Sequence, residues 1–236
     1  MSRTASLTLL LLLFTGAGCG LIDSSVDDFN LKIDKQTLTV DTTSWMLSAD
    51  DSLPSIDCSS MAGVCSAAAQ DVCGAEFCFG ECVAESGTCR LTVLVSLSET
   101  IDMKVEADGI EQVDDEPVIG VTVDRVYYNV VANTFEQVMM PPLSLYVAPR
   151  TVMSPGDPQA EMVGTIPAIA PGTTPQDVDV DFSGTGAEAL RKHIGDWQTP
   201  FNIIVGGTVT LEAGDTIPHG KIQVDVYVDA HADAVR

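Results

Sequence analysis

The residues best able to do chemistry in this sequence are its seven cysteines, which fall into two groups. Cys19 stands alone, directly after an apolar segment. The other six lie within 32 residues, at Cys58, Cys65, Cys73, Cys78, Cys82 and Cys89. Cysteines form disulfides, bind metal ions or carry reactive thiols, and the compartment in which the chain folds decides between these fates.

The first 18 residues have the order of a secretory signal peptide. Arg3 supplies a positive charge, the run from Leu7 to Phe14 is apolar except for Thr8, and small residues follow it. This run is far shorter than the roughly 20 residues that a helix needs to cross a bilayer. We therefore expect the chain to be exported into an oxidising compartment.

The pentapeptide TGAGC, which ends at Cys19, resembles the lipobox of bacterial lipoproteins. The resemblance implies that the Cys19 thiol receives a diacylglyceryl group, that the signal is cut before it and that the new amino group is acylated. Two or three acyl chains hold a protein on a membrane far better than one. Gly20, in place of aspartate, implies the outer membrane, so we expect residues 19–28 to form an acylated tether there.

The six clustered cysteines are expected to form three disulfides, because they are even in number and the chain is exported. Their segment is rich in Ala, Ser and Gly, so it cannot build much core and needs covalent staples. The alternative is a zinc site, with Cys78 and Cys82 on one helix face. Only Cys78-x₃-Cys82 and Cys73-x₄-Cys78 approach zinc-ligand spacing, and the segment holds no histidine. Disulfides are therefore favoured, with the connectivity left open.

Carboxylates could bind calcium in one loop. The sequence ADGIEQVDDEP offers Asp108, Glu111, Asp114, Asp115 and Glu116 as oxygen ligands, although it lacks EF-hand spacing. Aspartates alternate along 177–181, but one strand cannot surround an ion by itself. Solvated acidic side chains are the default interpretation, and a calcium site in the loop is the alternative.

No pattern in the sequence identifies a catalytic centre, so we expect a protein that is not an enzyme and needs no cofactor. Gly184, Gly186 and Ala189 follow a strand in G-x-G-x-x-A order, as in dinucleotide-binding sites. The aspartates of that strand do not suit a central parallel strand, which is apolar on both faces, so we interpret the motif as a turn and helix cap. The three histidines form no zinc pair, and neither G-x-S-x-G nor H-E-x-x-H occurs.

The elements that must position these residues are mostly strands. Apolar residues alternate with polar ones in several runs, which is typical of antiparallel sheets with one buried face. The predicted strands are 29–40, 91–105, 118–131, 143–147, 178–182, 201–211 and 221–230. Gly206 and Gly207 suggest a bulge or bend. Together these runs predict an all-β fold, an antiparallel β-sandwich.

One short α-helix is predicted near residue 190, with Leu190, Ile194 and Trp197 on its buried face. Thr185 and Glu188 suggest a capping box at its start. The expected organisation is a signal peptide (1–18), a tether (19–28), N-terminal strands (29–55), a disulfide-rich insertion (56–90) and the sandwich body (91–236).

Composition limits the partners. The chain has 11 basic and 34 acidic residues and a net charge of −23, which excludes nucleic-acid binding. We expect a membrane-anchored structural or binding module of the cell envelope, with an envelope protein or surface partner. The alternatives are a calcium-dependent adhesion module and, less favoured, an envelope hydrolase that uses a carboxylate pair. In the binding interpretation, the insertion presents Phe77 or Phe79 to the partner.

Overall fold

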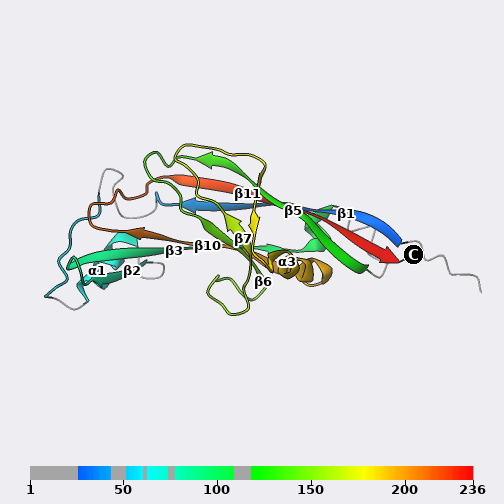
Figure 1. The fold of residues 1–236 in the computed structure, drawn as a ribbon, viewed down its shortest axis with the longest axis horizontal. Helices are drawn as coiled ribbons and strands as arrows, with labels where there is room; N and C mark the ends of the chain where they lie inside the picture. The colour runs from blue at the N-terminus through cyan, green and yellow to red at the C-terminus, as the bar shows by residue number, and fades with distance from the viewer. Residues whose placement is uncertain (1–25, 44–51, 61–62, 74–77, 109–117, 236) are drawn as a thin grey trace, which may run out of the picture.

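The computed structural model describes residues 26–43, 52–60, 63–73, 78–108 and 118–235, and shows two antiparallel sheets packed face to face (Figure 1). This confirms the predicted β-sandwich. The strands are β1 (Val26–Asp41), β2 (Cys78–Val83), β3 (Thr88–Ile101), β4 (Ala107–Asp108), β5 (Val118–Asn133), β6 (Leu143–Pro149), β7 (Glu161–Ile166), β8 (Val178–Asp179), β9 (Asp181–Phe182), β10 (Phe201–Leu211) and β11 (Lys221–Val235). The helices are α1 (Val64–Cys73), α2 (Met103–Glu106) and α3 (Gly186–Gly195).

The strand order of the first sheet is β4-β1-β11-β5-β8, and that of the second sheet is β2-β3-β10-β6-β7-β9. Alternate residues of both sheets point inward and form one main core, which includes Leu31 and Val226 from the first sheet and Ile203 from the second. Helix α3 closes this core with Leu190, and Trp197, two residues after the end of the helix, packs into the same core. Trp197 is therefore a core residue, as predicted.

The long strands of the first sheet define the two ends of the molecule. Strand β1 pairs with β11 from Val26↔Val235 at one end to Asp41↔Lys221 at the other, a length of about 50 Å at the usual rise per residue. Helix α1 and strand β2 lie at the end reached by Asp41, opposite the C-terminus (Figure 1). The chain therefore enters the sandwich at one end and builds its cysteine-rich segment at the other.

Two predicted strands end differently in the structure. The run 91–105 stops being a strand at Ile101, because the Asp102 side chain accepts a hydrogen bond from the Lys104 N–H and starts helix α2. The run 178–182 divides between the sheets: Val178 pairs with β5 in the first, and Phe182 pairs with β7 in the second. Strand β7 was not predicted.

Two local predictions differ from the structure. Gly206 and Gly207, where the sequence suggested a bulge or bend, form no bulge, since β10 keeps its register with β3 through both residues. The expected capping box at α3 also fails: Thr185 makes no side-chain capping bond, and Glu188 binds Arg191 instead. The single predicted helix was an undercount, because α1 and α2 are helical as well.

Candidate binding surface at the disulfide module

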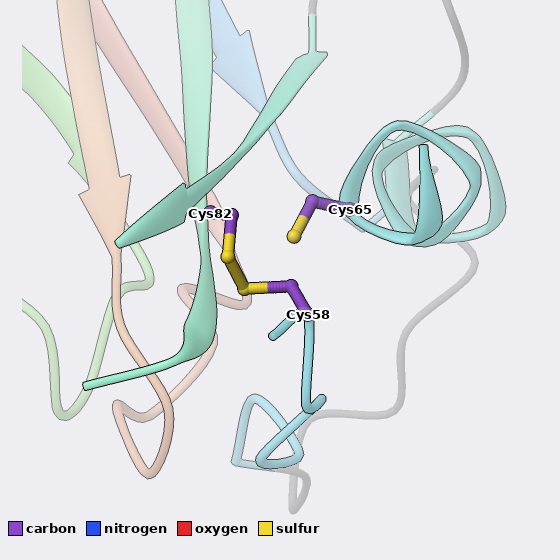
Figure 2. A group of neighbouring side chains, drawn as sticks. All are labelled: Cys58, Cys65 and Cys82. Carbon is purple, nitrogen blue, oxygen red and sulfur yellow. A yellow bond between two sulfur atoms is a disulfide. The ribbon is translucent and has the colours of Figure 1, made fainter. Parts of the chain in front are cut away.

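The Cys58–Cys82 and Cys65–Cys89 disulfides join the cysteine-rich segment to the sandwich, and Figure 2 shows the first of them. Cys58 bonds to Cys82 on β2, and Cys65 at the start of α1 bonds to Cys89 on β3. Cys78 is also disulfide-bonded, whereas the side chain of Cys73 lies outside the described residues. The predicted oxidation is thus confirmed for the described cysteines. We call residues 52–93, as far as the structure describes them, the disulfide module.

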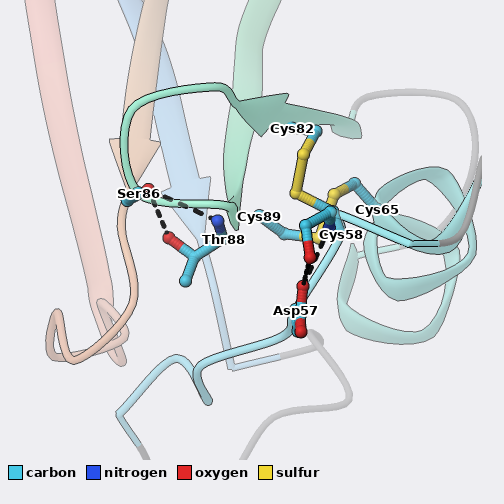
Figure 3. Close-up of a disulfide and its surroundings, with 8 residues drawn as sticks. Asp57, Cys58, Cys65, Cys82, Ser86, Thr88 and Cys89 are labelled. Carbon is cyan, nitrogen blue, oxygen red and sulfur yellow. Dashed lines mark hydrogen bonds between the residues drawn. A yellow bond between two sulfur atoms is a disulfide. The ribbon is translucent and has the colours of Figure 1, made fainter.

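Backbone hydrogen bonds hold the segment before α1 against the β2–β3 hairpin. The Cys58 N–H donates to the carbonyl of Gly87, and the Cys89 N–H donates to that of Ile56. Asp57 accepts bonds from the backbone and hydroxyl of Ser59, which lower the pKa of its carboxyl (Figure 3). The hairpin, the preceding segment and α1 therefore form one stapled body.

The module shares a core with the second sheet. Leu53 and Ala69 pack with Leu91 and Leu211 in a second buried cluster, distinct from the main core. Helix α1 also lies directly on β2, because a Cβ atom at Gly80 would be 1.9 Å from the carbonyl oxygen of Cys65. The disulfide-rich segment is therefore packed onto the sheet rather than suspended from it.

The outer face of β2 and β3 carries exposed apolar side chains. Phe79 is 54% exposed, and Leu94 is 39% exposed. Phe79 lies opposite Thr92, so Leu94 is two residues further along the neighbouring strand and on the same face. Phe77 lies outside the described residues. Sequence reasoning singled out Phe79, and the structure shows that its ring is exposed.

A groove of about 750 Å³ begins at Leu94 and crosses the outer face of the second sheet. Its walls and floor are formed by Leu94, Val95, Ser96, Pro142, Ser144, Tyr146, Met153, Ser154, Pro155, Gly156, Gly206, Gly207 and Thr208. None of these residues is charged, although 19% of the chain is. A groove of this size is in the usual range for a ligand site. We call Phe79, Leu94 and this groove the outer-face surface.

One wall of the groove is the loop that follows β6. The buried Asn202 side chain fixes the loop by donating to the carbonyls of Arg150 and Val152, at 3.0 and 2.7 Å. Gly206 lets the loop approach the sheet, because a Cβ atom there would be 2.7 Å from Pro155. The glycine that suggested a bulge in the sequence therefore makes room for this wall.

The candidate metal ligands do not come together in the described residues. Asp108 is exposed at the end of β4, while Glu111, Asp114, Asp115 and Glu116 lie outside the described residues. Two of the aspartates of 177–181 are in ion pairs with a side chain, since Arg125 binds both Asp177 and Asp179. Within the described chain the carboxylates thus form no three-ligand group.

The structure, in which these cysteines are disulfide-bonded, does not support the zinc alternative. Among the described residues, the one group with metal-ligand spacing is Cys58, Cys65 and Cys82, and each of these sulfurs is in a disulfide. Cys78 and Cys82 lie on a strand, so they share no helix face. Disulfide sulfurs are not thiolates, which are the form that binds zinc.

Gly186, in the G-x-G-x-x-A motif, lies where α3 contacts β7. Gly186 allows α3 to touch β7, because a Cβ atom there would be 1.7 Å from the carbonyl oxygen of Val163. The strand before α3 pairs antiparallel with β7, unlike the parallel strand of a dinucleotide site.

His193 is half-buried, and burial lowers its pKa below the ordinary value. His231 lies 2.9 Å from Asp124 on the surface of the first sheet.

Comparison finds no matching family model, curated protein or solved structure. No helix in the described part of the chain is long and apolar enough to cross a membrane. Cys19 and the predicted signal segment lie outside the described residues. The function must therefore be argued from the surface itself.

Proposed function

We propose that this protein is an exported, lipid-anchored, non-catalytic binding module of the cell envelope, and that it recognises its partner with the outer-face surface. The observation that carries the proposal is the placement of this surface. Strand β2, which carries Phe79, lies at the disulfide-linked end of the molecule, whereas β1, which follows the tether, begins at the other end (Figure 1). An anchor at Cys19 would thus leave Phe79 far from the attachment point.

The proposal also explains why the module is stapled. Binding costs less entropy when the recognition surface is already fixed in its bound form. Two disulfides and a shared core hold the hairpin that carries Phe79, and Asn202 fixes the loop that forms the groove wall. The surface therefore has rigid support on both sides.

The charge of the protein defines the partner's chemistry. A net charge of −23 repels anionic surfaces, so it disfavours direct contact with phosphate-rich lipid or nucleic acid. The groove itself holds no charged residue and is flanked by exposed apolar side chains. The partner should accordingly present an uncharged, partly apolar segment to the groove.

Point variants test this proposal better than removal of the insertion. Deleting residues 56–90 would uncover Leu91 and Leu211, so the sheet itself would lose part of its core. Phe79→Ser and Leu94→Ser change exposed residues and should leave the unfolding temperature unchanged. Phe182→Ser is the matched control, because Phe182 is also 39% exposed but lies on β9 at the opposite edge of the second sheet.

The assay is retention of envelope material on the immobilised, oxidised protein. Each of the two outer-face variants should bind at least tenfold more weakly in a saturable interaction. The Phe182→Ser control should bind as strongly as the wild type. Equal binding by all three folded variants would place recognition elsewhere. Loss in the control as well would show that the retained material binds exposed apolar surface without specificity.

A further inference from the structure

The Cys58–Cys82 and Cys65–Cys89 disulfides of the module are close enough to exchange partners. The Sγ atoms of Cys58, Cys65 and Cys82 all lie within 4.8 Å of one another, and Figure 2 shows Cys65 directed toward the Cys58–Cys82 bond. Cys89, the partner of Cys65, lies directly opposite Cys82 across the β2–β3 hairpin. A second pairing, Cys58–Cys65 with Cys82–Cys89, therefore joins residues that are already neighbours.

Access to these sulfurs is uneven. Cys58, Cys65 and Cys89 are buried, whereas Cys82 is an exposed residue on the outer strand of the second sheet. Disulfides are exchanged by attack of a thiolate on one sulfur, so the accessible sulfur decides where an external thiol enters. In this cluster Cys82 is the one exposed residue.

We propose that Cys82 is the entry site for a thiol, and that a small-molecule or protein thiol catalyses the interconversion of the two disulfide pairings. The inference goes beyond the proposed binding function and does not depend on it, because it needs only the four sulfurs and an external thiol.

Each step is a thiol–disulfide exchange. An external thiolate attacks Cys82, forms a mixed disulfide and releases the thiolate of Cys58. This thiolate attacks Cys65, forms the Cys58–Cys65 bond and releases the thiolate of Cys89. Cys89 then attacks Cys82, forms the Cys82–Cys89 bond and expels the external thiolate. Two disulfides are present before and after, so the thiol is a catalyst and no net oxidation or reduction occurs.

The exchange changes which segments of the module the disulfides link. In the observed pairing, the segment around Cys58 and the start of α1 are each fixed to the hairpin. In the second pairing these two segments are linked to each other, and the hairpin is closed on itself. The covalent connection between α1 and β3 is lost, while the packing of Ala69 and its neighbours still holds the helix on the sheet.

The test is disulfide mapping after treatment with a catalytic amount of reduced glutathione. The oxidised wild-type protein is incubated with the thiol, quenched with acid, digested with pepsin and analysed without reduction by mass spectrometry. Peptides linking Cys58 to Cys65 and Cys82 to Cys89 should appear together and in equal amounts. Retention of the original pairing alone, a lasting glutathione adduct on Cys82, or scrambling that includes Cys73 and Cys78 would overturn the proposal.

A double variant tests the entry site. Cys58→Ser with Cys82→Ser removes the exposed bridge and keeps the buried Cys65–Cys89 bridge. Glutathione should then open Cys65–Cys89 at least tenfold more slowly than in the wild type, because no exposed sulfur leads to it. An unchanged rate in a folded variant would show that thiols enter elsewhere. The wild-type mapping decides the proposal even where the double variant does not fold.

Discussion

Replacing Gly80 with alanine should destabilise the protein strongly, because helix α1 lies against strand β2 at this residue. A Cβ atom at Gly80 would lie 1.9 Å from the carbonyl oxygen of Cys65 and 2.3 Å from its carbonyl carbon. Both are backbone atoms, and the disulfide to Cys89 holds Cys65 in place, so no flexible side chain can move aside. Overpacking usually costs about 1–3 kcal/mol, and the fixed backbone puts Gly80→Ala near the upper end, at about 3 kcal/mol.

The loss is measurable by chemical and thermal unfolding of the oxidised protein. For a chain of this size, about 3 kcal/mol corresponds to a fall in Tm of roughly 6–12 °C. The matched control is Gly184→Ala, because nothing lies within 4 Å of a Cβ atom built there. Its free energy of unfolding should change by less than about 0.5 kcal/mol, as is usual for surface substitutions. If Gly80→Ala is equally harmless, α1 does not pack on β2 as described.

Three further predictions concern the anchor, the staples and one histidine. Cys19→Ser should move the protein from the membrane fraction to the soluble fraction, and persistence on membranes after a high-salt wash would mean a different anchor. Alkylation of the unreduced, denatured protein should label none of the six clustered cysteines, and removal of the Cys65–Cys89 bridge should lower the free energy of unfolding by about 2–5 kcal/mol in a denaturant titration. Burial lowers the pKa of His193 in the folded protein, so folding favours the neutral imidazole. The contribution of this side chain to the free energy of unfolding is therefore fully present above its unfolded pKa of 6.5 and is lost as the pH falls below that value. His193→Gln should flatten the fall in stability between about pH 7 and pH 5, and an unchanged slope would contradict the assignment.

The strands of the sandwich were predictable because alternation of apolar and polar residues reports one buried face. The run 201–211 coincides with β10, and 118–131 lies within β5. Alternation failed where a strand changes its surroundings, as at Asp102, where a local side-chain bond starts a helix, and at Val180, where the chain passes between the sheets.

The disulfide module was predictable in chemistry but not in shape. The count of six cysteines and the expected export of the chain indicated disulfides, yet VCSAAAQDVC carries no strong apolar stripe, so α1 was not predicted. Helix α1 is held by the Cys65–Cys89 disulfide and by the packing of Ala69 in one cluster with Leu91. Both contacts join residues that are far apart in the sequence. The groove of the outer-face surface was not predictable either, because it joins three strands and a loop.

The exposure of Phe79 was one of two outcomes that the sequence left open. Phenylalanine is usually buried. A single apolar residue in a cysteine-rich segment, however, defines no hydrophobic periodicity from which to assign it to a face. The register of β2 on β3 decides it: Cys78 and Val93 point into the shared core, which directs Phe79 to the opposite face.

The central claim, that the outer-face surface contacts an envelope partner, is tested most directly by photo-crosslinking in intact cells. A photoreactive phenylalanine analogue replaces either Phe79 or the control residue Phe182, and adducts are compared after irradiation. The account predicts a discrete adduct from position 79 that Leu94→Ser abolishes, and none from position 182. An adduct from position 182 alone, or none from position 79 in the membrane-anchored protein, would contradict it.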